Sequence, residues 1–192
     1  MIIVMRSDGE ATRERILLAA GREFAAHGLA GARVDRIAAE ANASKERLYA
    51  YFGDKRALFF AVLTAHMDEV LESMPLSADD LPGFVGRIFD FARSHPEHFR
   101  MMDWARLGGD FDLLPPISPV VIERDRVAIV EAQRRGLVDP AWEPSDLFGL
   151  LFSIALSQAN VGVLNGTADA SPEATTRQRD AVMRAAAKLI AP

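Results

Sequence analysis

Hydrophobic residues recur along most of the chain at the three- and four-residue spacing that is typical of α-helices. Near the start, Ile16, Ala20 and Phe24 lie about one helical turn apart. Thr12 before them is a good N-cap, and Gly28 after them predicts the end of the helix. No segment has the alternation of apolar and polar residues that is typical of a half-buried strand. The pattern therefore predicts an all-α protein.

Two shorter helices are predicted next, at about 34–41 and 45–52. Asn42 lies in the turn between them, and Asn tolerates the left-handed backbone conformation that a tight turn requires. Ser44 is a suitable N-cap for the third helix, and Gly53 ends it. The spacing thus predicts a helix-turn-helix, with a longer fourth helix following directly.

The rest of the chain also reads as helical. The fourth helix covers 54–73, and further helices are predicted at about 84–94, 96–107, 119–135, 144–164 and 172–190. Residues 147–164 are apolar on nearly every side, which indicates a helix that is covered on more than one face. We therefore expect this helix to contribute both to the core and to a subunit interface.

Composition and charge narrow the class of protein. The chain has no cysteine, which excludes disulfides and thiolate chemistry. Its net charge of −5 is uneven, since residues 1–60 hold ten Lys/Arg against eight Asp/Glu and the remainder is acidic. A slightly basic N-terminal segment followed by an acidic remainder is typical of a DNA-binding domain joined to a partner domain. We expect a cytoplasmic protein with no membrane segment, because polar residues interrupt the longest apolar region.

The third predicted helix has two chemically different faces. Leu48 and Phe52, four residues apart, belong on its buried face, so Glu46 and Ala50 point away from the core. Arg47 and Tyr49 flank the outward positions. A recognition helix needs this layout, with one face fixed to the neighbouring helices and the other directed at base edges in the major groove.

The outward residues have suitable chemistry for reading bases. Arg47 can donate two hydrogen bonds to guanine, Glu46 can accept one from cytosine, and Ala50 can contact a thymine methyl group. The positions expected to contact phosphates are Lys45, Tyr49, Tyr51 and Lys55. A charged, solvated helical corner would have the same spacing, so spacing alone leaves both interpretations open.

The segment from about residue 12 to residue 63 resembles the N-terminal DNA-binding domain of the tetracycline-repressor-like (TetR) family. The shared positions are Ala19, Ala20, Phe24, Gly28, Ile37, Ala38, Ala41, Ser44, Leu48, Tyr49, Tyr51, Phe52, Lys55, Leu58 and Phe59. The resemblance implies that Lys45, Glu46, Arg47, Tyr49 and Tyr51 contact DNA, together with Arg33 and Lys55. The remainder is similar to the family in being an all-helical domain.

Three residues depart from the family pattern. Arg33 stands where Thr usually caps the second helix, so it can replace a phosphate contact but not the cap. Asn42 stands where Gly is usual. Glu46 stands where a small residue is common, and an acid there would restrict the operator sequence or weaken non-specific binding.

The resemblance also implies a domain organisation. Residues 1–53 form a helix-turn-helix domain with a flexible start at 1–11, residues 54–73 form a connecting helix, and residues 74–192 form a ligand-binding and dimerisation domain. A small molecule bound within the helices of residues 80–165 would change the spacing of two DNA-binding heads. Candidate lining residues are Phe91, His95, Phe99, Met102, Trp104, Phe111, Phe152 and Asn160. The same aromatic and methionine residues also suit a plain core, so this alternative stays open.

We therefore expect a homodimeric, ligand-responsive repressor that binds a near-palindromic operator in double-stranded DNA and is released by a small apolar effector. Dimerisation is expected through about 144–166 and 172–190. Catalytic, metal and cofactor sites are not expected, because the chain has no G-x-S-x-G, H-E-x-x-H or phosphate-loop motif. The alternatives are a helical-bundle enzyme and an interaction protein without DNA binding.

Overall fold

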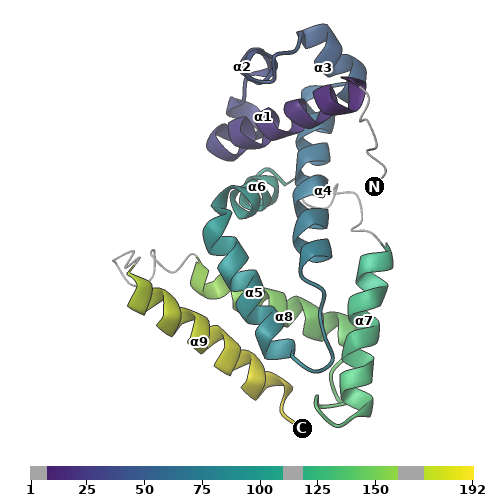
Figure 1. The fold of residues 1–192 in the computed structure, drawn as a ribbon, viewed down its shortest axis with the longest axis vertical. Coiled ribbons are helices and arrows are strands. Elements are labelled where there is room, and N and C mark those ends of the chain that lie inside the picture. Colours follow the sequence, from purple (N-terminus) through teal and green to yellow (C-terminus); the bar gives the residue numbers. More distant parts are fainter. Residues whose placement is uncertain (1–7, 110–118, 160–170) are drawn as a thin grey trace, which may run out of the picture. The chain divides into compact units, whose positions relative to one another are not determined.

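The computed structural model describes residues 8–109, 119–159 and 171–192. Their regular secondary structure is entirely helical, which confirms the predicted fold class. The helices are α1 (Asp8–Gly31), α2 (Val34–Glu40), α3 (Lys45–Phe52), α4 (Lys55–Ser73), α5 (Leu81–Ser94), α6 (Pro96–Leu107), α7 (Pro119–Arg134), α8 (Pro144–Ala159) and α9 (Pro172–Ile190) (Figure 1). The part of the eighth predicted helix beyond residue 159 lies outside the described residues.

The chain divides into two compact units. The first contains residues 1–67 and 96–116, and the second contains residues 68–95 and 117–192. The first unit therefore combines α1, α2 and α3 with most of α4 and with α6, which packs against α1. The second contains the end of α4 together with α5, α7, α8 and α9. The domain boundaries expected at residues 53 and 73 stay a prediction.

The first unit is built on the apolar face of α1. Ile16, Ala20 and Phe24 are fully buried there, as the spacing predicts. The Phe24 ring meets Phe59 of α4 edge-on, with 5.2 Å between the ring centroids. Thr12 does not cap α1, contrary to the prediction. The helix already includes Asp8, and the Thr12 hydroxyl donates to the Asp8 carbonyl (2.8 Å).

Helical geometry breaks at Gly28, as predicted, although one further turn follows. Its backbone angles (φ 63°, ψ 179°) are almost restricted to glycine. A Cβ atom there would lie 2.9 Å from the Trp104 ring of α6. The Trp104 indole N–H donates to the Ala25 carbonyl at 3.2 Å. The absence of a side chain at residue 28 thus allows α6 to approach α1.

Charged side chains of α1 hold both ends of α2. Arg15 Nε donates to the carbonyl of Ala41 at the end of α2 (3.1 Å). Glu23 Oε1 accepts from the backbone N–H of Arg33 at its start (2.8 Å) and from Arg36 Nη2 (2.6 Å). Residues 15 and 23 are eight apart, as are residues 33 and 41, so the two antiparallel segments have matching lengths.

Glu23 is charged although only 8% of it is exposed. Burial alone would raise the pKa of its carboxyl group. The hydrogen bonds from Arg36 and from the Arg33 N–H, with the charges of Arg36 and His27, outweigh burial and bring the pKa of Glu23 below its usual value of 4.5. The ionised carboxylate therefore stabilises the contact between α1 and α2.

Two histidine rings lie in contact, tilted relative to each other, inside the first unit. The centroids of His66 on α4 and His98 on α6 are 3.8 Å apart. Burial, and then the charge of His98, lowers the pKa of His66 from 6.5 to about 4. His66 is therefore neutral at neutral pH.

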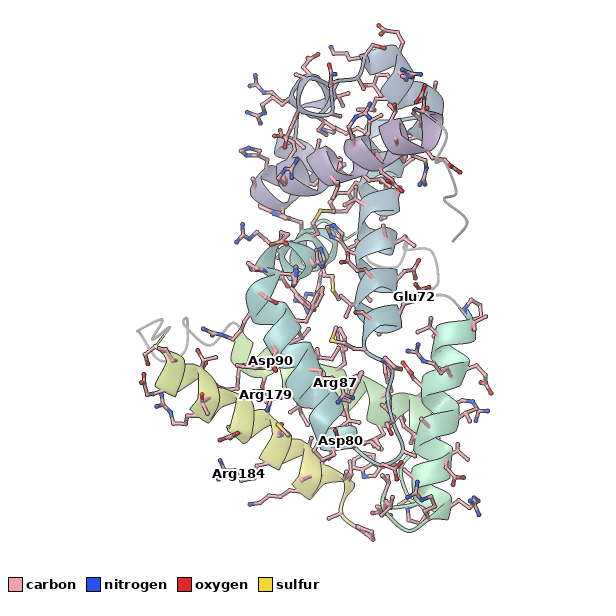
Figure 2. The ribbon with its side chains drawn as sticks, viewed as in Figure 1. Glu72, Asp80, Arg87, Asp90, Arg179 and Arg184 are labelled. Atoms are coloured by element: carbon pink, nitrogen blue, oxygen red, sulfur yellow. The ribbon has the colours of Figure 1, made fainter. Side chains whose placement is uncertain are left out.

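The second unit has its own core, formed mainly by α5, α8 and α9. Its fully buried residues include Phe84, Ile88, Leu147, Leu151 and Ala186. Arg179 of α9 reaches Asp90 of α5, with 2.8 Å between Nε and Oδ2 (Figure 2). Of the described helices, none is both long and apolar enough to cross a membrane.

Replacing Glu23 with Gln removes the charge that Arg36 and the start of α2 require. We expect the free energy of unfolding of the first unit to fall by about 1–3 kcal/mol at neutral pH, as measured by urea denaturation. The contribution of Glu23 is present above pH 4.5 and is lost as the pH falls through its lowered pKa. Glu40→Gln is the matched control, because Glu40 pairs with Arg22 on the surface and should change stability by less than about 1 kcal/mol. Equal losses for both variants would contradict the role of Glu23.

The contact between His66 and His98 should make the stability of the folded chain sensitive to acid. Because the pKa of His66 is about 4 in the folded chain and 6.5 when exposed, protonation favours the unfolded state. Stability should therefore fall as the pH drops from 6.5 towards 4, by at most about 1.4 kcal/mol per pH unit. His66→Gln should flatten this part of the curve of unfolding free energy against pH. Parallel curves for the variant and the wild-type chain would show that the pair does not set the acid response.

Candidate nucleic-acid interface

The α3 helix is fixed from within and exposed outward, as its sequence predicts. Ser44 caps it, because the Ser44 Oγ accepts from the backbone N–H of Arg47 (3.1 Å). Leu48 is fully buried and Phe52 is 9% exposed, so both belong to the core of the first unit. The opposite face of α3 is therefore available to a partner.

The turns on either side of α3 have the expected backbone geometry. Asn42 has a φ of 50°, which confirms its left-handed conformation. Gly53 has a φ of 79°, and its N–H donates to the Tyr49 carbonyl at 2.8 Å. Asp54 then caps α4 by accepting from the Ala57 N–H at 2.7 Å. Both ends of α3 are thus held by local hydrogen bonds.

The three predicted base readers, Glu46, Arg47 and Ala50, are all exposed on α3. A hydrogen bond from its own backbone N–H, followed by one from the Ser44 hydroxyl, keeps the pKa of Glu46 below its usual value of 4.5. Ionised Glu46 can only accept hydrogen bonds, so it suits the amino group of cytosine and repels phosphates. Arg47 offers the planar donor fork that matches guanine.

The predicted phosphate contacts already have roles within the chain. Lys45 forms an ion pair with Asp35 of α2. Lys55 Nζ donates to the carbonyls of Ala32 (3.1 Å) and Ala30 (3.4 Å), beyond the Gly28 break. An ammonium group has three donors, so Lys55 keeps one for a phosphate.

The remaining predicted contacts differ in exposure. Tyr49 is 41% exposed, whereas Tyr51 is half-buried and packs against the core. Arg33 is exposed at the N-cap position of α2, where its side chain makes no capping hydrogen bond. Sequence reasoning missed Glu23, which accepts the Arg33 N–H. A usable signal was present, because an acidic residue at position 23 interrupts the apolar face of α1.

The candidate effector residues fall into two groups. Phe99, Met102 and Trp104 lie in the first unit, whereas Phe91, His95 and Phe152 lie in the second. Phe99 is buried, and the rings of Phe91 and His95 stack with centroids 4.2 Å apart. Phe111 and Asn160 lie outside the described residues. The sequence led us to expect one effector site lined by all of these residues, but neither unit alone contains all of them.

Each unit contains a hollow. A wide depression of about 670 Å³ in the first unit is lined by Lys55, Trp104 and Leu107, among others. A more enclosed cavity of about 160 Å³ in the second unit is lined mainly by apolar residues, among them Leu71 and Phe148, together with Asp125, Arg126 and Ser145. Of the effector candidates that the structure describes, only Trp104 lines either of these two hollows.

Comparison with known proteins covers both parts of the chain. Residues 16–62 match the model of the bacterial regulatory proteins of the tetR family. Residues 80–188 match the tetracyclin repressor-like C-terminal domain. The two matches follow one another in the order that the sequence resemblance implies.

Individual relatives extend the match over nearly the whole chain. The chain is 38% identical over 189 residues to the HTH-type transcriptional repressor SCO4008 of Streptomyces coelicolor, covering 95% of this chain and 97% of that protein. The crystal structure of SCO4942 from Streptomyces coelicolor has a TM-score of 0.76 and 38% identity, covering 93% of this chain and 98% of the other. Bacillus subtilis FadR, solved in complex with stearoyl-CoA, shares the fold, with a TM-score of 0.69, 14% identity and coverage of 93% and 99%.

SCO4008, which the chain matches over 97% of its length, is named as a transcriptional repressor and not as an enzyme, and this decides against the helical-bundle enzyme. The exposed face of α3 agrees with a DNA-binding helix-turn-helix. The chain belongs to the TetR family of bacterial transcriptional regulators.

Proposed function

We propose that the chain is a homodimeric repressor that binds a near-palindromic operator and is released by a small apolar effector. The observation that carries the proposal is the geometry of α3, which is locked by Leu48 and Phe52 and exposes Glu46 and Arg47. The naming of the 38% identical relative as a repressor supports the direction of regulation. A regulator that acts on chromosomal DNA works in the cytoplasm.

The proposed contacts divide into base reading and positioning. Arg47 reads guanine, Glu46 accepts from cytosine, and Ala50 allows close approach to the bases. Lys45 and Lys55 contact phosphates, with Arg33, Tyr49 and Tyr51 beside them. On binding, phosphates replace Asp35 as the partner of Lys45, because that ion pair is exposed and contributes little.

The proposed dimer interface is formed by α8, α9 and their symmetry mates. Leu150 on α8 is 39% exposed although it lies within a largely apolar run. Ala181 and Ala185 are exposed on α9 and are small enough for close helix packing. Four helices around a two-fold axis would bury these positions, and the two DNA-binding heads would then read two half-sites.

The effector is proposed to bind in the helices of residues 80–165. Support comes from the half-buried aromatic rings of Phe91 and Phe152 in the second unit and from its apolar cavity. The cavity volume of about 160 Å³ is below the range of roughly 300–1,000 Å³ for drug-sized ligands. The proposed effector is therefore either small or enters with rearrangement of side chains.

Arg47→Ala tests base reading. We expect operator binding to weaken by about 1–3 kcal/mol and discrimination at one base pair to be lost. Fluorescence anisotropy on DNA from upstream of the chain's own gene measures both effects. Arg106→Ala, which removes an exposed arginine of α6, is the control and should bind normally. Unchanged sequence preference in Arg47→Ala would refute its role as a base reader.

Lys45→Ala tests phosphate contact in the same assay. We expect affinity to fall about equally for every DNA sequence, and the slope of log affinity against log salt to decrease by about 1. Failure of the wild-type chain to bind any DNA would instead favour an interaction protein without DNA binding.

Leu150→Glu tests the proposed dimer. A carboxylate in the α8–α9 interface is costly to bury, so the variant should have half the mass of the wild-type assembly. Sedimentation at micromolar concentration measures this mass, which is read as a multiple of the 21.0 kDa chain. Leu18→Glu is the matched control, because Leu18 is 64% exposed on α1 and should leave the mass unchanged. A wild-type monomer, or a Leu150→Glu protein of wild-type mass, would contradict the proposal.

A further inference from the structure

The outer face of α7 exposes large apolar residues. Val120, Val127 and Val130 are 78%, 51% and 40% exposed, and Leu137 just beyond the helix is 44% exposed. The α7 helix lies at the edge of the second unit and packs against α8 (Figure 1). Its opposite face, with Val121, Ile129 and Ala132, is buried. The exposed valines are thus additional to the residues that attach α7 to its own unit.

These residues follow the spacing of a helix-pairing seam. Val120, Glu123, Val127, Val130, Arg134 and Leu137 are separated by alternating steps of three and four residues. This is the heptad spacing by which two helices pack along one another. Leu137 lies just beyond the end of α7, where Gly136 has a φ of 70° and the Leu137 N–H donates to the Ala132 carbonyl (2.9 Å), and its side chain is 44% exposed. We refer to these six residues as the α7 seam.

The α7 seam is complementary to itself in one orientation. A two-fold axis passing between residues 128 and 129 places Val127 opposite Val130 of a second, antiparallel copy. The same axis places Glu123 opposite Arg134 and brings Val120 near the turn that follows α7 of the second copy. A parallel arrangement would set Glu123 against Glu123, and a shift of one heptad would set Glu123 or Arg134 against valine. Only the antiparallel register centred between 128 and 129 therefore matches both apolar and charged positions.

The charges of the α7 seam are already ordered on the single helix. Glu123 pairs with Arg126 at 2.7 Å, and Arg134 pairs with Glu131 at 2.8 Å. Hydrogen bonding from Arg126 keeps the carboxyl of Glu123 ionised by lowering its pKa. Both ion pairs are exposed, so each contributes little free energy. Glu123 and Arg134 can therefore exchange or share partners with a second chain at a small free-energy cost.

We propose that the α7 seam binds the α7 seam of a second copy of this chain in an antiparallel pair. The pair is separate from the α8–α9 interface proposed above and adds a second two-fold axis. With two perpendicular, intersecting two-fold axes, the two interfaces together would join two dimers into a closed assembly of four chains.

Charge reversal tests the pairing through sedimentation at tens of micromolar. Glu123→Arg alone sets Arg against Arg134, and Arg134→Glu alone sets Glu against Glu123, so each variant should have half the wild-type mass. An equimolar mixture of the two variants should recover the wild-type mass, because every facing pair is again of opposite sign. The double variant Glu123→Arg/Arg134→Glu should recover it by itself. Misfolding of a single variant would lower the mass but could not lead to its recovery in the mixture. Circular dichroism checks that each variant keeps its helical content.

Two further variants separate this inference from the proposed dimer. If both interfaces exist, Val127→Glu and Leu150→Glu each halve the mass. If only Val127→Glu does so, the α7 pair stands and the α8–α9 dimer fails. If Val127→Glu and the single charge reversals keep the wild-type mass, or if the charge swap fails to recover it, the α7 pairing is overturned.

Discussion

The placement of the recognition helix depends on two opposite charges of α1 that hold the two ends of α2. Glu23 lies at the start of α2, where the helix dipole is positive, and Arg15 lies at its end, where the dipole is negative. Each side chain thereby satisfies a backbone group and matches the local field. Since only a short turn separates α2 from α3, fixing α2 also limits where α3 begins. The hydrophobic core around Leu48 then fixes which face of α3 is turned inward.

Local patterns were sufficient to predict most of this first unit. The spacing of apolar residues gave the helices and the buried faces, and Ser44, Asn42 and Gly53 marked the turn because their chemistry is local. Glu23 was missed because its partners, Arg33 and Arg36, lie ten and thirteen residues away. Periodicity marks Glu23 as an acid on the apolar face of α1, but it does not show which distant residues pair with it. The Thr12 prediction failed for a related reason, since a good capping residue is also tolerated inside a helix.

Sequence was less informative for the second half of the chain. Aromatic and methionine residues indicate burial, but periodicity does not say which residues they contact. Phe99 and Phe91 are close in sequence and yet belong to different units. On α7, apolar residues occupy two faces, and only the structure separates the buried Ile129 from the exposed Val127. Whether the candidate residues form one effector site is a question of arrangement, which composition does not encode.

The ionised Glu46 has a consequence for how the protein searches a genome. Non-specific binding depends on the number of phosphates that a protein neutralises, and a bacterial chromosome offers millions of competing sites. In the complex proposed above, the negative charge of Glu46 lies among the DNA-facing residues, so it weakens every non-cognate encounter, while a correctly placed cytosine offsets the repulsion at the operator. Fewer molecules are then retained on irrelevant DNA. A small number of copies per cell would suffice to occupy the cognate site.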